Sequence, residues 1–341
     1  MTSHLSASAT ASPNPLSWLA NGVLAIKPLA NLAKNKARTM MIERAESIGV
    51  YWRDEVQQLN ARGGNAEFSA QWAQDLAAVQ NPDLVYPNYY VTSFHAYEEG
   101  NLGWQPAMEV EVAAKAVHAR IWPEAGAEGD TQLRQSYHHV LKANLPQSPT
   151  EIVDLGCSVG MSTEALQATF PGAGLTGVDL SPYFLAVAKY RQDRNYFHSD
   201  QGGQPIGMAA GDAALNPSTL KPIAWHHAAA EATGLPDGGF DLVSACLVFH
   251  ELPQSAAIAI IHEARRLLRP GGHLAIMDMN PACETFTQMP PFVLTLLKST
   301  EPYLDEYFGL NFNSTFQAAG FGEPTIVTNS PRHHTVIAEA I

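Results

Sequence analysis

One acid and two glycines form a motif in this chain that could bind a ligand. Asp154 is followed by Gly156 and Gly160, directly after the apolar residues Ile152 and Val153. Glycines in a turn before a helix N-terminus let backbone N–H groups and bare Cα atoms approach a ligand. The spacing differs from the G-x-G-x-x-G pattern that holds a dinucleotide pyrophosphate. The sequence therefore predicts a cofactor-binding turn, and fits a pyrophosphate poorly.

A second acid follows at the end of the next predicted strand. Gly174–Leu180 (GLTGVDL) contains Asp179 near its tip, where a carboxylate can accept hydrogen bonds from two ribose hydroxyls. A third acid, Glu231, precedes Leu235-Pro236 and comes after an apolar-alternating segment at 223–227. The acids thus stand after successive strands, and parallel strands bring such positions to one edge of a sheet.

Strands and helices alternate through the second half of the chain, which predicts an α/β fold. Helical spacing covers Met161–Phe170, and Pro182 opens a further helix. We expect Leu268–Gly272 to close a helix with a C′ glycine before a fifth strand, His273–Met279. Two last strands, at 325–328 and 335–338, fit an antiparallel pair.

With these motifs in this order, the chain resembles class I S-adenosylmethionine-dependent methyltransferases. The resemblance is to the small-molecule, type 11 subgroup that includes ubiquinone/menaquinone methyltransferases, and it covers Thr150 to about Pro281. It implies a Rossmann-like seven-stranded methyltransferase sheet, here with an extra N-terminal all-helical region. It also implies S-adenosyl-L-methionine as the cofactor and methyl transfer to a small, partly apolar organic acceptor.

The resemblance further implies the residues of the cofactor site. The turn would line the methionine end of the cofactor, Asp179 would bind the ribose, and Glu231 would accept from the adenine amino group. The predicted cofactor-binding residues are Asp154, Gly156, Cys157, Ser158, Gly160, Asp179, Leu180, Glu231, Ala232 and Leu247.

Two residues depart from the family pattern. Ser158 replaces the middle glycine of D-x-G-x-G-x-G, a change that is tolerable if its backbone angles stay ordinary. Glu231 replaces the usual aspartate, and a shifted alignment would place Ala229 there. We favour Glu231, because Leu235-Pro236 then keeps its usual offset.

The predicted catalytic residues are His250, Glu251 and Tyr97. His250 and Glu251 follow the fourth strand, and His250 could act as a general base or orient the acceptor. Tyr97 belongs to an aromatic segment at 86–104, whose rings could face a sulfonium cation. His95 and Trp104 of that segment are further candidates. Asp278 and Asn280, which end the fifth strand, could reach the acceptor.

Other functions stay open at this point. A non-catalytic cofactor-binding module, a protein or RNA methyltransferase and an aminopropyl transferase share the fold. Phe249–Leu252 is not the Asn/Asp-Pro-Pro-Tyr/Phe turn of enzymes that methylate adenine or glutamine nitrogens. The paired aspartates typical of aminopropyl transfer are not evident either.

Composition suggests three regions. Residues 1–15 are rich in Ser, Ala and Pro and predicted to be disordered. Residues 16–145 form a predicted helical cap, and residues 146–341 the cofactor-binding domain. The predicted helices of the cap are Thr39–Leu59, Ala66–Val79, Pro106–Ile121 and Thr131–Ala143. A Gly/Pro-rich insertion at 197–222 is long enough to cover the site.

Charge and cysteine content narrow the partners. With 20 Lys and Arg against 33 Asp and Glu, the net charge is −13, which disfavours nucleic acid. Three widely spaced cysteines predict no disulfide framework and no metal site, and favour the cytoplasm. The basic, apolar stretch 16–38 predicts either peripheral membrane contact or an ordinary amphipathic helix. No feature specifies an oligomeric state.

Overall fold

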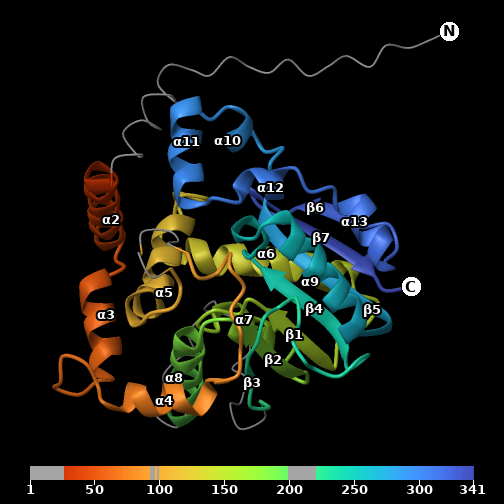
Figure 1. Cartoon of the computed structure of the whole chain (residues 1–341), viewed down its shortest axis with the longest axis horizontal. Coiled ribbons are helices and arrows are strands. Elements are labelled where there is room, and N and C mark those ends of the chain that lie inside the picture. The colour runs from red at the N-terminus through yellow and green to blue at the C-terminus, as the bar shows by residue number, and fades with distance from the viewer. Residues whose placement is uncertain (1–26, 93–96, 98–99, 199–219) are drawn as a thin grey trace.

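A seven-stranded sheet forms the centre of the molecule, with strand order β3-β2-β1-β4-β5-β7-β6 (Figure 1). The computed structural model describes residues 27–92, 97, 100–198 and 220–341. Strands β1 to β5 run parallel, and β7 pairs antiparallel with both β5 and β6. The strands are β1 (Glu151–Leu155), β2 (Gly174–Asp179), β3 (Ala224–His227), β4 (Phe240–Cys246), β5 (Leu268–Met279), β6 (Thr325–Thr328) and β7 (His333–Glu339). This is the Rossmann-like methyltransferase sheet expected from the sequence, including the final antiparallel pair.

Alternate residues of the central strands enter two separate cores. In β1, Ile152 packs with Leu166 on one face of the sheet, and Val153 packs with Ile260 on the other. This period of two is the pleat of a strand covered on both faces. The helices of the C-terminal part are α7 (Met161–Thr169), α8 (Pro182–His198), α9 (Gln254–Leu267), α10 (Glu284–Thr287), α11 (Pro291–Thr300), α12 (Leu304–Phe308) and α13 (Phe312–Ala319).

An all-helical layer precedes the sheet, as predicted. Its helices are α2 (Lys27–Ser47), α3 (Trp52–Ala61), α4 (Gln71–Val79), α5 (Trp104–His118) and α6 (Gly129–Asn144). The single helix predicted for Thr39–Leu59 is wrong: Gly49, at φ 85°, separates α2 from α3. The helix predicted from Ala66 begins only at Gln71. In Figure 1, α2 and α3 lie at the outer side of the molecule and α5 lies between them and the sheet.

Helix α6 connects this layer to the sheet. The Tyr137 hydroxyl lies 3.0 Å from Ser244 Oγ and donates to the Ala275 carbonyl at 3.2 Å. Leu133, Tyr137 and Leu141 are fully buried in the same core cluster as Ile152. The last helix of the layer is therefore part of the covering of the sheet.

The helix end predicted at Leu268–Gly272 is wrong in detail. Helix α9 ends at Leu267, Leu268 has extended backbone angles, and β5 begins there with a register shift against β4. Gly271, at φ 80°, lies within this first part of β5 and is not a helix C′ residue. The predicted tail 1–15, the first part of 16–38 and most of the insertion 197–222 lie outside the described residues.

Candidate functional site

The turn after β1 is bonded to the end of β2. The N–H groups of Gly156 and Cys157 both donate to the Val178 carbonyl, at 2.8 and 3.0 Å. Gly156 (φ 71°) and Gly160 (φ 86°) have left-handed backbone angles. A Cβ on Gly160 would lie 2.7 Å from the Trp225 ring. Both positions therefore require glycine, which explains their spacing in the sequence.

Ser158 corrects one expectation. Its φ is 51°, so the serine adopts a left-handed conformation instead of ordinary angles, at the position where the family pattern has glycine. Its N–H donates to Asp179 Oδ2 at 2.8 Å, and its buried hydroxyl has no hydrogen-bond partner. Leu247, after β4, also has a positive φ of 61°. Such strain concentrates at functional sites, and both residues were predicted cofactor contacts.

Asp154 and Cys157 are buried in the base of the turn. Asp154 Oδ2 accepts from Ser162 Oγ at 2.6 Å and from Thr163 Oγ1 at 2.7 Å, so the carboxylate anchors the start of α7. Burial raises the pKa of the Cys157 thiol well above its usual range. Cys157 is thus a packed thiol, as its small size in the turn suggested.

Asp179 lies at the end of β2, at the edge of the turn. Its carboxylate accepts from Ser158 N at 2.8 Å and from Ser181 N at 2.7 Å. Burial raises its pKa to about 6, although these backbone hydrogen bonds oppose the shift. A buried carboxylate of this kind, with little access to water, is stabilised when a ligand supplies further hydrogen-bond donors.

Glu231 lies after β3, where the sequence placed it. Its Oε1 accepts from the Tyr89 hydroxyl at 2.7 Å, and its Oε2 is buried without a hydrogen-bond partner. Ala232 beside it is exposed and forms a bridge with Ala229. The Leu180 carbonyl accepts from His227 Nε2 at 3.0 Å. Neither Tyr89 nor His227 was predicted as a site residue; an aromatic cluster signalled the first, and nothing signalled the second.

His250 and Asp278 form a buried pair at the ends of β4 and β5. His250 Nδ1 donates to Asp278 Oδ1 at 2.7 Å, and the His250 N–H reaches Oδ2 at 3.2 Å. Burial alone would lower the pKa of His250, but the Asp278 carboxylate outweighs it and raises the pKa to about 10. His250 is therefore protonated at neutral pH. This state argues against the general-base role and favours the acceptor-orienting role.

Glu251, the acid among the predicted catalytic residues, is partly accessible. Its Oε1 lies 3.9 Å from His250 Nε2, and its side chain is 27% exposed. Asn280, by contrast, accepts from the Ala282 N–H at 3.0 Å and caps a turn. Asp278 lies at the end of β5, and the structure gives it a specific partner, His250, that the sequence did not reveal.

Arg134 of α6 is a buried cation that sequence reasoning missed. Its Nε donates to Asp130 Oδ2 at 2.9 Å. Its Nη2 also donates to Asp130 Oδ1 at 3.3 Å and lies 3.9 Å from Met161 Sδ, whereas Nη1 approaches only Cys246 Sγ, at 3.7 Å. Sulfur is a weak acceptor. The guanidinium therefore keeps donor capacity between the end of β4 and the start of α7, beside the turn.

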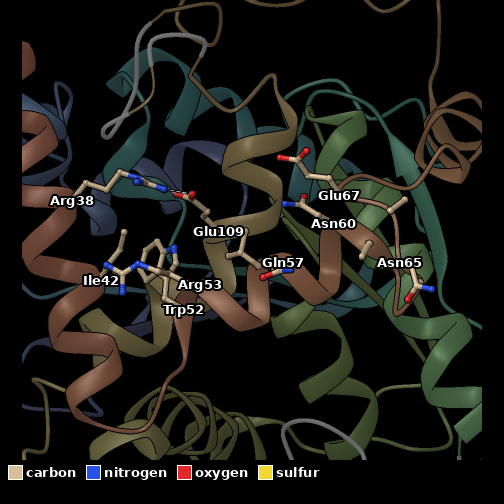
Figure 2. A pocket seen from close by; sticks show the side chains of 13 residues that line it. Arg38, Ile42, Trp52, Arg53, Gln57, Asn60, Asn65, Glu67 and Glu109 are labelled. Carbon is tan, nitrogen blue, oxygen red and sulfur yellow. Dashed lines mark hydrogen bonds and ion pairs between the residues drawn. The ribbon is translucent and has the colours of Figure 1, made fainter.

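Tyr97 lies in the N-terminal layer. Its hydroxyl donates to Glu109 Oε2 at 2.8 Å, and Glu109 is also ion-paired with Arg38. Glu109 lines a pocket of about 880 Å³ among α2, α3 and α5. Figure 2 shows the Arg38 and Glu109 side chains pointing toward each other in the wall of this pocket. The structure thus joins Tyr97 to this pocket. Trp104 packs on Trp72 and Tyr183 instead, and His95 lies outside the described residues.

The residues at the ends of β1, β2 and β3 fit an adenosyl cofactor. Asp179, with a raised pKa, and the unpartnered Ser158 hydroxyl lie at the strained turn, and Glu231, with an unpartnered carboxylate oxygen, follows the neighbouring strand β3. Adenosine carries the donors and acceptors that these groups lack. Across the described ranges, no group of His, Cys, Asp or Glu side chains could hold a metal ion. No described helix is long and apolar enough to cross a membrane.

Comparison with known proteins identifies the central part of the chain. Residues 153–276 match a family model described as a methyltransferase domain. The chain is 33% identical over 137 residues to a trans-aconitate 2-methyltransferase of Methylobacterium nodulans, which is 40% of this chain and 41% of that protein. It is 26% identical to a demethylmenaquinone methyltransferase of Thermus thermophilus, over 40% of this chain and 50% of that protein.

The chain therefore spans less than half the length of the trans-aconitate methyltransferase it matches. A solved structure of a SAM-dependent methyltransferase from Aquifex aeolicus aligns over 65% of this chain and 98% of its own, with a TM-score of 0.43 and 16% identity. The matched residues include the last part of β1, the turn after it, the acids at the end of β2 and after β3, and His250. The chain thus carries a methyltransferase domain of the class I, S-adenosylmethionine-dependent family.

Proposed function

We propose that this protein transfers a methyl group from S-adenosylmethionine to a small, partly apolar organic acceptor. The observation that carries the proposal is the set of buried acceptors on neighbouring strands, with Asp179 after β2 and Glu231 after β3, beside the strained turn at Ser158. The family match of residues 153–276 supports it. The cofactor, when bound, supplies a methyl group already activated on a sulfonium.

The residues of this chain then have separate tasks. Asp179 would hold the ribose hydroxyls, and Glu231 the adenine amino group. Arg134 Nη1 approaches only the weak acceptor Cys246 Sγ, so this guanidinium would bind the carboxylate at the amino-acid end. The turn 156–160 would cover that end with backbone. Because an activated donor needs position and exclusion of water, these tasks account for most of the chemistry.

The acceptor would bind beyond the ends of β4 and β5. Protonated His250 can donate from Nε2 and so orient an acceptor oxygen, while Glu251 is the accessible carboxylate beside it. Half-buried Leu247, Val248 and Met279 supply apolar surface at the same edge. The relatives are named for trans-aconitate, demethylmenaquinone and malonyl-acyl carrier protein, which supports an acceptor that combines polar and apolar parts.

The three cysteines support a reducing compartment, for which we propose the cytoplasm. Cys157, Cys246 and Cys283 are all buried and unpaired. Membrane contact through 16–38 gains no support from the described part of that stretch. There, Arg38 is ion-paired with the buried Glu109.

Methyl transfer and cofactor binding can be measured separately. We expect the full chain to bind S-adenosylhomocysteine in calorimetry and to release labelled methyl from S-adenosylmethionine to a metabolite extract. Asp179→Ala should weaken the binding and abolish the transfer. Binding without transfer to any small acceptor would instead indicate a non-catalytic module. Transfer to added protein or RNA alone would contradict the small-molecule assignment.

A further inference from the structure

A segment of the N-terminal layer crosses the ends of β2 and β3. The Asn81 N–H donates to His227 Nδ1 at 2.8 Å, and His227 Nε2 donates to the Leu180 carbonyl at 3.0 Å. These two bonds fix the ring as the neutral Nε2–H tautomer, and burial lowers its pKa accordingly. His227 therefore fastens residues 81–90, here named the tyrosine segment, beside the predicted adenosyl site.

The tyrosine segment places hydroxyl groups against both acids of that site. Tyr89 donates to Glu231 Oε1 at 2.7 Å, and the Tyr90 hydroxyl is near enough to the Asp179 carboxylate to act on its pKa, which it lowers. Tyr86 lies 3.3 Å from His227 Nε2, and its ring stacks on Tyr90 at 6.3 Å with an interplanar angle of 7°. The hydroxyls thus reach groups on two neighbouring strands from one short segment.

The bond to Glu231 divides the functions of its two oxygens. Tyr89 occupies Oε1, and its half-buried ring packs against the core that contains α9, so the carboxylate cannot turn freely. Oε2 is left buried without a partner. A buried acceptor without a donor costs free energy until a ligand supplies one. The arrangement therefore demands an N–H or O–H group at one defined position.

We propose that Tyr89 is a positioning residue that sets the base selectivity of the adenosyl site, by holding Glu231 so that Oε2 faces an exocyclic amino group. This inference rests on the proposed function, which supplies the identity of the ligand. An adenine amino group donates to Oε2. The carbonyl of hypoxanthine at the same place would leave Oε2 unpaired and face a carboxylate oxygen. Sites built on such a bond discriminate strongly against analogues that lack the donor.

The test compares two ligands that differ only in this group. Calorimetry with the full chain measures the affinities of S-adenosylhomocysteine and its deaminated form, S-inosylhomocysteine. We expect the natural protein to prefer the adenosyl form by at least about tenfold, the scale of one buried, charge-assisted hydrogen bond. Tyr89→Phe should lose most of this preference, because Glu231 becomes free to turn, and should weaken adenosyl binding by about tenfold or less.

Two further variants sharpen the result. Glu231→Gln places an amide at the same position, whose N–H can donate to a carbonyl, so its preference should shift toward the inosyl form. Tyr86→Phe removes a hydroxyl from the same segment that contacts His227 and not Glu231. It is the matched control and should keep the preference of the natural protein.

The outcomes are distinct. Tyr89→Phe could keep the full preference for the adenosyl form while its thermal unfolding temperature falls. The Tyr89–Glu231 bond would then only stabilise the fold, and the inference would be overturned. If the folded natural protein binds neither ligand, the proposed function itself fails. Equal affinities of the natural protein for both ligands would leave the methyltransferase proposal intact and overturn the role of Tyr89.

Discussion

The two sides of the site differ in how their buried polar groups are satisfied. At the ends of β1 to β3, Ser158 Oγ and Glu231 Oε2 lack partners, and Asp179 carries a raised pKa. At the ends of β4 and β5, His250 and Asp278 satisfy each other. We call the first side incomplete, because these acceptors lack donors, and the second side complete, because the charges of His250 and Asp278 neutralise each other. This difference indicates that the cofactor side is specific for one ligand, whereas the His250–Asp278 pair makes the acceptor side a rigid part of the fold.

Breaking the complete side should have the largest effect on stability. Asp278→Asn leaves a buried His250 without its counter-charge, and we expect the free energy of unfolding to fall by about 3–5 kcal/mol. Urea denaturation measures it. The control is Asp193→Asn, which breaks a pair with a 50% exposed carboxylate and should change stability by about 0.5 kcal/mol or less. Equal effects of the two changes would contradict a stabilising role of the buried His250–Asp278 pair.

The same pair gives the protein a pH-dependent stability. The folded pKa of His250 is raised from 6.5 to about 10. Its contribution is therefore fully present below about pH 6.5 and is lost as the pH rises through about 10. The urea midpoint should fall over this window in the natural protein, and Asp278→Asn should flatten the fall.

Breaking the incomplete side should affect ligand binding more than folding. Asp179→Ala should weaken S-adenosylhomocysteine binding by about 1–3 kcal/mol, because the ribose hydroxyls lose their acceptor. Calorimetry at neutral pH checks this. His250→Gln is the comparison on the other side and should leave cofactor affinity unchanged while lowering turnover. An unaltered affinity of Asp179→Ala would remove this residue from the site.

Lowering the pH should weaken cofactor binding in the same way as Asp179→Ala, but less strongly. The pKa of Asp179 is raised to about 6, so the acceptor carboxylate is lost as the pH falls through that value. Affinity for S-adenosylhomocysteine should then drop by up to about tenfold per pH unit. Asp179→Asn cannot titrate, and its affinity should stay level from pH 7 to about pH 5. A parallel decline in both proteins would assign the effect to another group.

The smallest expected effect comes from a hydroxyl on the complete side. Tyr307 donates to the Met279 carbonyl at 2.8 Å and lies 3.1 Å from His334 Nε2. Tyr307→Phe should cost about 0.5–1.5 kcal/mol of unfolding free energy. It should leave the affinity for S-adenosylhomocysteine unchanged. A loss of affinity in this variant would show that the two sides are coupled.

The sheet and the cofactor turn could be predicted because their signals are local. Gly156 and Gly160 are fixed by positive φ and by contact with Trp225, and Asp179 ends a clearly apolar strand. Ser158 contradicted the expectation because a residue type does not report its backbone angles. The helix break at Gly49 was missed since a helical period continues across it.

The rest of the site depends on contacts between distant segments. Tyr89 lies 142 residues from Glu231, and Arg134 lies 112 residues from Cys246. No periodicity or motif brings such pairs together; only the docking of the helical layer on the sheet does. His250 could be placed at the edge of β4 from the sequence, but its charge state depends on Asp278 at 28 residues' distance.

The position of Tyr137 limits where a shorter fragment of the chain can begin. Its side chain fills the space above β4 and β5, so a fragment that starts at residue 146 would lack part of its own interior. A minimal catalytic fragment should instead start before Gly129, and fragments cut on either side of α6 should differ sharply in solubility when they are expressed.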